Sequence, residues 1–200
     1  MAKNKFYVVK KGRTPGIYTT WDECKNEVAG YKGAIYKSFS GYQDAKDFFS
    51  DEHGYEKSFN SDDKVIAFVD GSYNITTGEF SYGAVAFYKG EKICFSKKFN
   101  DVELSSMRNV AGEIEGAKFI MQYCVENNIR KLDIYYDYMG IEKWARGLWK
   151  TNKVGTMMYK KYYDSIKDKV KVNFIKVKAH SNNKYNDLAD KLAKEAIGIA

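Results

Sequence analysis

Four acidic residues stand in sequence contexts that suit metal-dependent chemistry. Asp70 and Asp137 are expected at the ends of strands, and Glu113 and Asp190 on helices. The contexts are Phe-Val-Asp-Gly-Ser for Asp70, Asn-Val-Ala-Gly-Glu for Glu113, Ile-Tyr-Tyr-Asp-Tyr for Asp137, and Asn-Asp-Leu-Ala-Asp-Lys-Leu-Ala for Asp190. Carboxylates that converge from such positions can hold hard divalent cations. In a basic chain, this set predicts metal-dependent chemistry on a polyanion.

Each of these carboxylates also has an ordinary structural alternative. Asp70 could cap a loop, and Asp137 could be the N-cap of a helix, a position that aspartate favours. Glu113 could be a solvated residue at a helix edge, and Asp190 could lie on a solvated helix face. Spacing alone does not choose between Asp190 and the nearby Asp187 as the candidate ligand.

One histidine is placed for proton transfer. His180 follows the last predicted strand and precedes the helix that carries Asp190. A histidine there could move protons near neutral pH, and the alternative is a surface loop residue.

A long helix over residues 106–127 is predicted to carry Glu113. Its interior holds Gly112 and Gly116, and glycine inside a helix costs about 1 kcal/mol relative to alanine. A close approach to a sheet or to a ligand would explain that cost. Asn109 lies one turn before Glu113 and is expected on the same face. The apolar stripe that defines the helix comprises Val110, Ile114, Ala117, Met121 and Cys124.

The elements that must position these side chains alternate along residues 64–200. Strands are predicted at 64–70, 82–88, 91–99, 131–137 and 170–178, and helices at 106–127, 139–149, 155–168 and 185–199. The resulting order, βββαβααβα, predicts an α/β fold with a mixed sheet and helices packed on it.

A smaller unit precedes this domain. Strands are predicted at 5–11, from 17 and at 33–39, with helices from Thr20 or Asp22 to about 29 and at 43–49. Residues 51–63 are acidic and lack a clear period, so we expect a linker there. The predicted domains are therefore residues 1–50, the linker 51–63, and residues 64–200.

Composition limits the classes of function. The 200-residue chain has a net charge of +7, and its first 43 residues alone carry +5, which suits an anionic partner such as nucleic acid. The chain has no run of the roughly 18–20 apolar residues that a membrane span needs, and its N-terminus is too polar for a secretory signal. Three cysteines without metal-type spacing predict reduced thiols and a cytoplasmic protein.

Residues 64–200 resemble type 1 ribonuclease H. The resemblance rests on Val-Asp-Gly-Ser after the first strand, Asn-x-x-x-Glu on the long helix, Tyr-Asp after the fourth strand, and His-Ser followed by Asn-x-x-x-Asp-x-Leu-Ala. It implies a mixed five-stranded sheet flanked by helices. It also selects Asp190 over Asp187 and makes His180 the mobile catalytic histidine.

Residues 4–50 resemble the small hybrid-binding module that precedes the catalytic domain in many such enzymes. The matching segments are Phe-Tyr-Val-Val, Gly-Arg-Thr-Pro-Gly-Ile-Tyr, Thr-Trp-Asp-Glu-Cys-Lys and Ala-Ile-Tyr-Lys-Ser-Phe. The resemblance places Trp21 and Tyr36 on the sugars and bases of the DNA strand and Lys37 on a phosphate. The alternative is that Trp21 and Tyr36 form the core of a very small domain.

Together the two resemblances imply an endonuclease that hydrolyses the RNA strand of an RNA–DNA hybrid and leaves 5′-phosphate and 3′-hydroxyl ends. Asp70 would bridge two Mg²⁺ ions about 4 Å apart, with Mn²⁺ as a substitute. Glu113, Asp137 and Asp190 would complete the metal sites. The residues expected to contact nucleic acid in this domain are Asn109, Ser72 and Asn74. We expect a monomer without an obligatory protein partner and without a membrane partner.

The chain departs from these families at several positions. Tyr138 follows Asp137 where many members have serine, and Ser38 replaces a second lysine of the N-terminal module. The loop after Asp70 lacks the usual glycine-proline pattern. The segment 144–154, with Arg146, Lys150 and Lys153, is short for the basic protrusion of some relatives, so the N-terminal module is expected to supply the grip. The alternative functions are a hybrid- or duplex-RNA-binding protein without activity and another nuclease of the same broad fold.

Overall fold

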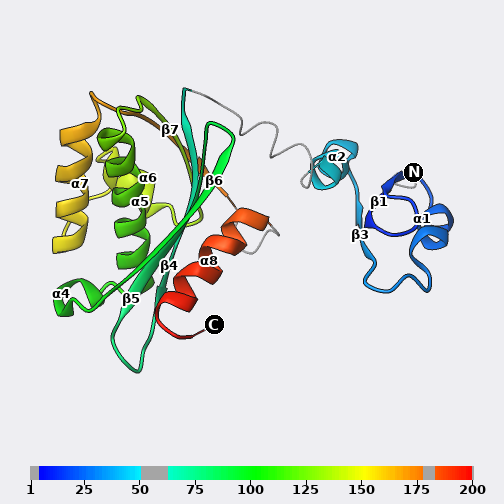
Figure 1. Cartoon of the computed structure of the whole chain (residues 1–200), viewed down its shortest axis with the longest axis horizontal. Coiled ribbons are helices and arrows are strands. Elements are labelled where there is room, and N and C mark those ends of the chain that lie inside the picture. Colours follow the sequence, from blue (N-terminus) through cyan, green and yellow to red (C-terminus); the bar gives the residue numbers. More distant parts are fainter. Residues whose placement is uncertain (1–4, 51–62, 178–182, 200) are drawn as a thin grey trace. The chain divides into compact units, whose positions relative to one another are not determined.

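The computed structural model describes residues 5–50, 63–177 and 183–199. The chain divides into two compact units, residues 1–58 and residues 59–200, and each is described by itself (Figure 1). The predicted linker 51–63 lies almost wholly outside the described residues.

The first unit is a small antiparallel sheet with two helices. Its elements are β1 (Phe6–Lys11), β2 (Gly16–Tyr18), α1 (Trp21–Val28), β3 (Ile35–Phe39) and α2 (Tyr42–Ser50), and the strand order is β2-β1-β3. Thr20, rather than Asp22, caps α1: its side chain accepts from the Glu23 amide at 3.3 Å, and Glu23 accepts from the Thr20 amide at 3.1 Å. This reciprocal capping box fixes where α1 begins.

The second unit has the predicted five-stranded mixed sheet, and its strands lie in the order β6-β5-β4-β7-β8. Its strands are β4 (Val65–Tyr73), β5 (Phe80–Tyr88), β6 (Glu91–Phe99), β7 (Lys131–Tyr136) and β8 (Lys171–Lys176). Its helices are α4 (Val102–Ser105), α5 (Asn109–Glu126), α6 (Gly140–Ala145), α7 (Val154–Ile166) and α8 (Lys184–Ala196). Strands β4, β7 and β8 run parallel, and β5 and β6 are antiparallel.

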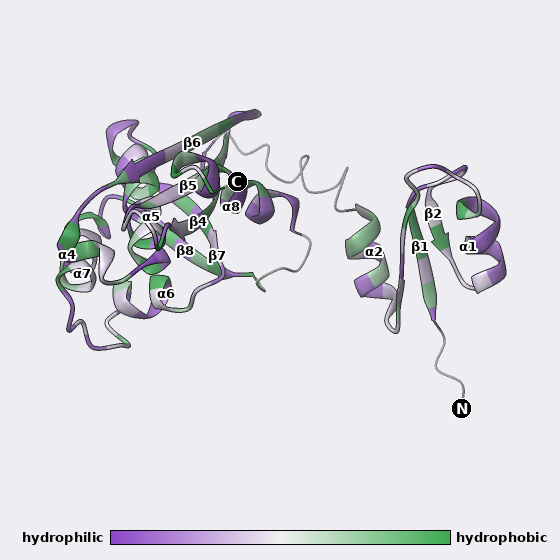
Figure 2. Ribbon diagram, turned by 90° about the horizontal axis from the view of Figure 1, so that it is seen from below, coloured by the Kyte–Doolittle hydropathy of each residue, from purple (hydrophilic) through white to green (hydrophobic). Residues whose placement is uncertain are grey.

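Helices cover both faces of this sheet. Helix α5 packs against β4 and β5 on one face, with α7 beside it, and α8 crosses the other face (Figure 1). The alternating side chains of β4 are buried on both sides, whereas the edge strand β6 is largely exposed and has both hydrophilic and hydrophobic stretches in Figure 2. Among the described helices, none combines the length and apolar character that a bilayer crossing requires.

Several predicted boundaries were wrong, and two of them bear on the site. The long helix begins at Asn109 rather than near 106, because Arg108 has a φ of 55° and separates α5 from the unpredicted short helix α4. Asp101 caps α4 by accepting from the amides of Glu103 and Leu104, each at 3.0 Å. The only sequence signal for α4 was an aspartate followed by a single helical turn, which is too short to show a helical period.

Strand β4 does not end at Asp70 as predicted. Its pairing with β7 stops at Phe68, but its pairing with β5 continues to Tyr73, with Asp70 opposite Gly83. Asp70 therefore lies within β4, just past the point where the parallel neighbour ends. The carboxyl ends of parallel strands form sites in this way even when one of the strands continues.

Gly71 lets helix α5 come close to strand β4. A Cβ atom at Gly71 would lie 2.2 Å from the Asn109 carbonyl oxygen, and one at Gly112 would lie 1.9 Å from the Ser81 carbonyl oxygen. Helix α5 thus rests almost directly on the backbone of the sheet. The predicted reason for glycine inside this helix, a close approach to the sheet, is confirmed.

Candidate active site

Three of the four predicted carboxylates meet. Asp70 of β4, Glu113 of α5 and Asp137 after β7 each offer an oxygen atom, and these atoms all lie within 4.8 Å of one another. The contact between Gly71 and Gly112 brings Glu113 down to the sheet beside Asp70. The end of β7 delivers Asp137 to the same place, as the sequence predicted.

Glu113 is buried, with 3% of its surface exposed, so its interpretation as a solvated edge residue was wrong. Burial raises its pKa well above the usual value, and the charges of Asp137 and Asp70 raise it further. The Asn109 side chain donates a hydrogen bond to Glu113 Oε1 at 3.3 Å, and this bond lowers the pKa of Glu113. Asn109 therefore orients the carboxylate from one turn away, on the predicted face.

Asp70 shows the same crowding of negative charge. Its pKa is raised to about 7, mainly by burial and next by Asp137. A hydrogen bond from the Gly71 amide to Asp70 Oδ1, at 2.7 Å, partly offsets this rise. Carboxylates held together against their own repulsion fit a hard divalent cation, because the cation replaces protons and relieves the repulsion.

Asp190 lies near this cluster but outside the group of three. It is half-buried on α8, and Lys194 contacts its Oδ2 at 2.7 Å. Its charge also raises the pKa of Asp70, so the two carboxylates are close. The competing candidate, Asp187, is exposed.

Two further predictions concern the ends of strands. Asp137 is not a helix N-cap, because α6 begins at Gly140 and Met139 holds the cap position. His180 lies outside the described residues, so its catalytic role stays a prediction.

The N-terminal unit presents three neighbouring aromatic rings. Trp21 and Tyr36 are 43% and 47% exposed, so the alternative that they form a core was wrong. Their ring centroids lie 5.9 Å apart, and Tyr7 lies 5.7 Å from Trp21. Lys37 is exposed on the neighbouring strand position. Sequence reasoning missed Tyr7, although Tyr7 and Tyr36 are placed on one face by the pairing of β1 with β3.

Comparison with known proteins covers both units. A family model for RNase H matches residues 62–198, and one for the ribonuclease H1 N-terminal domain matches residues 5–49. The chain belongs to the ribonuclease H family.

Individual relatives of this ribonuclease H family member match either unit. A Ribonuclease H of Caldanaerobacter subterraneus is 31% identical over 151 residues, which is 69% of this chain and 94% of that protein. A Ribonuclease H of Saccharomyces cerevisiae is 61% identical over 46 residues, 23% of this chain. That match spans only 13% of the yeast protein's length.

Solved structures share the fold of the larger unit. A ribonuclease H1 from Halobacterium salinarum has a TM-score of 0.55 at 19% identity, covering 68% of this chain and 99% of that one. LC11-RNase H1 in complex with an RNA/DNA hybrid has a TM-score of 0.50 at 16% identity, covering 66% and 99%.

Two predicted contact residues of the ribonuclease H domain lie in β4 and in the turn that follows it. Ser72 is buried in β4, with 6% of its surface exposed. Asn74 closes the turn after β4, where its side-chain oxygen accepts from the amides of Thr76 and Thr77 at 2.9 and 3.3 Å. Their contacts with nucleic acid stay predictions.

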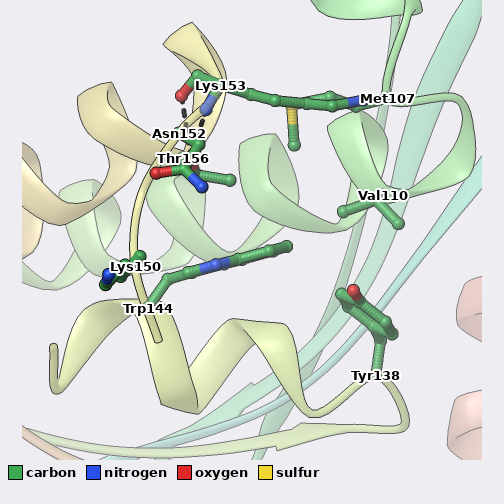
Figure 3. Close-up of a pocket in the computed structure, with 8 residues that line it drawn as sticks. All are labelled: Met107, Val110, Tyr138, Trp144, Lys150, Asn152, Lys153 and Thr156. Carbon is green, nitrogen blue, oxygen red and sulfur yellow. Dashed lines mark hydrogen bonds between the residues drawn. The ribbon is translucent and has the colours of Figure 1, made fainter. Parts of the chain in front are cut away.

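A pocket of about 290 Å³ has Tyr138, the residue directly after Asp137, in its wall (Figure 3). The sequence did not predict this pocket. The segment 144–154, expected to be only a short basic protrusion, supplies half of its lining residues. Arg146 is instead paired with Glu142 at 2.8 Å. The lining residues are Met107, Val110, Tyr138, Trp144, Lys150, Asn152, Lys153 and Thr156. The sequence signal that could have indicated this pocket is the set of three aromatic residues, at 138, 144 and 149, interleaved with lysines.

Proposed function

We propose that this chain is an endonuclease that hydrolyses the RNA strand of RNA–DNA hybrids and leaves 5′-phosphate and 3′-hydroxyl ends. The observation that carries the proposal is the meeting of Asp70, Glu113 and Asp137 within 4.8 Å in a member of the ribonuclease H family. The binding of an RNA/DNA hybrid by LC11-RNase H1, which shares the fold, supports the choice of substrate.

The carboxylates would hold two Mg²⁺ ions, or Mn²⁺ in their place. Asp70 would be shared, Glu113 and Asp190 would complete one site each, and Asp137 would join one of them. Such ions, when bound, lower the pKa of an attacking water and stabilise the charge on the leaving oxygen. The hard oxygen donors and the raised pKa of Asp70, about 7, support this assignment.

The protein's own groups have separate tasks. Asn109 holds the Glu113 carboxylate by its hydrogen bond of 3.3 Å, which leaves the other carboxylate oxygen to meet an RNA 2′-hydroxyl. His180 would transfer a proton or assist product release. Because these contacts meet sugars and phosphates, the shape and hydroxyl pattern of the hybrid would set specificity, not its base sequence.

The N-terminal unit would bind the hybrid. The exposed rings of Trp21, Tyr36 and Tyr7 form a face on which sugars and bases of the DNA strand can stack, and Lys37 would neutralise a phosphate.

A panel of labelled duplexes tests the proposal. With Mg²⁺, the purified chain should cut only the RNA strand of a hybrid and leave DNA–DNA and RNA–RNA duplexes intact. Tight hybrid binding without cleavage would instead favour a binding protein. Cleavage of DNA–DNA duplexes would favour another nuclease of the same fold.

A further inference from the structure

Asp137 lies just beyond the strand pairing of β7. The ladder between β4 and β7 ends with Phe68 opposite Tyr135, and α6 does not begin until Gly140. Continued by two residues, that register would set Asp137 opposite Asp70, where the carboxylates meet. The direction of the Asp137 side chain must therefore be fixed by contacts outside the β4–β7 ladder.

A side-chain hydrogen bond spans the segment that carries Asp137. The hydroxyl of Tyr136, the residue directly before it, donates a hydrogen bond to Oε2 of Glu142 in α6 at 2.8 Å. Tyr136 is buried, with 1% of its surface exposed, so its hydroxyl needs a partner within the protein. The bond ties the last residue of β7 to α6, and Asp137 lies between the two tied points.

Arg146 and Phe174 hold the acceptor in place. Nε of Arg146 lies 2.8 Å from Oε1, the other carboxylate oxygen of Glu142. The Arg146 guanidinium lies over the Phe174 ring of β8 at 5.4 Å, and that ring meets Tyr136 edge-on at a centroid distance of 6.2 Å. The contacts therefore form a closed set from β7 through α6 to β8 and back to β7. A Glu142 side chain that swung away from Tyr136 would also lose its ion pair with Arg146.

The position of the Tyr136 ring controls the orientation of the strand end. Successive side chains of a strand point to opposite faces, so a rotation of the β7 end about its own axis would move Tyr136 and Asp137 together. Tyr136 belongs to the same core cluster as Ile114 and Ile141. Its hydrogen bond to Glu142 holds the ring at one depth in that core, which opposes the rotation and keeps the Asp137 carboxylate in the cluster.

Resting on the proposed function, we propose that Tyr136 and Glu142 are positioning residues for the metal site. Their hydrogen bond, held by Arg146, sets the direction in which the Asp137 carboxylate meets a divalent cation. In this role both residues act through Asp137 and not by contact with the cation or the substrate.

Calorimetric titration of Mn²⁺ into the full-length protein, without nucleic acid, tests this role. Tyr136→Phe removes the hydroxyl but keeps the ring and the net charge, so the general attraction of the protein for a cation is unchanged. We expect the Mn²⁺ affinity to fall about tenfold, the lower end of the effect of losing a group that orients a metal ligand.

Tyr159→Phe is the matched control. The buried Tyr159 hydroxyl donates to the Ile141 carbonyl oxygen at 2.9 Å, so this variant also removes a buried hydroxyl that holds α6. It leaves the bond between Tyr136 and Glu142 intact and should keep the wild-type Mn²⁺ affinity.

Glu142→Gln tests the second partner of the bond. The loss of affinity in Tyr136→Phe/Glu142→Gln should be smaller than the sum of the two separate losses, because both variants disrupt the same contact. Thermal unfolding shows that each variant is folded at the temperature of the titration. Since Glu142 is only half-buried, Glu142→Gln gives the same comparison with Tyr159→Phe if Tyr136→Phe does not fold.

The wild-type Mn²⁺ affinity in Tyr136→Phe, or an equal loss in Tyr159→Phe, would overturn the inference and leave the proposed function standing. A wild type that binds no Mn²⁺ would contradict the proposed metal site itself, and the inference with it.

Discussion

At the scale of single residues, the site is defined by carboxylates that repel one another. Asp70 is surrounded by Asp137 after β7, Glu113 on α5 and Asp190 on α8, and Lys194 is the nearby cation. Its pKa is about 7 in the folded protein, against 3.8 for an ordinary aspartate. The folded protein therefore keeps a proton on Asp70 that the unfolded chain has already lost at pH 5 or 6.

This difference predicts the pH dependence of stability. Between about pH 4 and pH 7 the folded state binds the extra proton, so the free energy of unfolding of the metal-free protein falls as the pH rises. Each pKa unit corresponds to about 1.4 kcal/mol, so the total is a few kcal/mol. Asp70→Asn removes this penalty.

Thermal unfolding in a metal chelator at pH 4 and pH 8 checks the prediction. Asp70→Asn should raise the melting temperature relative to the wild type at pH 8, and the difference should shrink toward pH 4. Equal differences at the two pH values would show that Asp70 carries no such penalty.

At this scale the sequence predicted which residue types would meet but not their surroundings. Asp70 and Asp137 were recognisable because each follows a strand-forming run. The burial of Glu113 was not predicted: the glycines of its helix indicated a close approach to a sheet or a ligand, but Glu113 lies outside the apolar stripe and was read as a possible solvated edge residue. The Tyr138 pocket was missed because its wall is assembled from four separate segments.

At the scale of elements, the site depends on how closely α5 lies on the sheet. A Cβ atom at Gly112 would lie 1.9 Å from a backbone oxygen, which cannot move without displacing β5. We expect Gly112→Ala to push α5 outward, to destabilise the fold by about 3 kcal/mol, and to abolish activity by moving Glu113. Unfolding in urea and cleavage of a hybrid measure the two effects.

Gly116 of the same helix is the matched control. A Cβ atom there would lie 3.0 Å from the Tyr82 Cβ atom, so a shift of a few tenths of an ångström relieves the contact, far less than the 1.9 Å approach at Gly112 demands. The gain of about 1 kcal/mol in helix propensity offsets that contact, so Gly116→Ala should be nearly neutral. Equal losses for Gly112→Ala and Gly116→Ala would contradict a specific role for the Gly71–Gly112 contact.

The order of elements was predictable because helical and strand periods alternate cleanly along residues 64–200. The residues at which helices and strands end were less predictable. Strand β4 outlasts its parallel neighbour because β5 continues to pair with it, and such pairing is invisible in the sequence of one strand. The break between α4 and α5 comes from one residue, Arg108, in a left-handed conformation.

At the scale of the whole molecule, the chain has two compact units, and the proposed function assigns binding to one and cleavage to the other. The change in composition around residues 51–63 predicts a linker between two domains, and the compact units of the structure are residues 1–58 and 59–200. The position of His180 and the properties of the predicted linker lie outside the described residues and stay predictions.

The division predicts that binding and chemistry can be separated. Trp21→Ala removes one stacking ring and should weaken hybrid binding about tenfold, since one base–aromatic stack contributes roughly 1–3 kcal/mol. The cleavage rate at saturating hybrid should stay unchanged. Tyr31→Ala, an exposed aromatic of the same unit outside the group of three rings, is the control. A fall in the saturating rate for Trp21→Ala would contradict the division.

Cleavage of a hybrid with both strands labelled, by the wild type and Asp70→Asn in Mg²⁺, tests the central claim most directly. The wild type should cut only the RNA strand, while Asp70→Asn should bind the hybrid and leave it intact. Equal cleavage by both proteins, or hybrid binding by the wild type without cleavage in either Mg²⁺ or Mn²⁺, would contradict the assignment of this carboxylate cluster as the catalytic metal site.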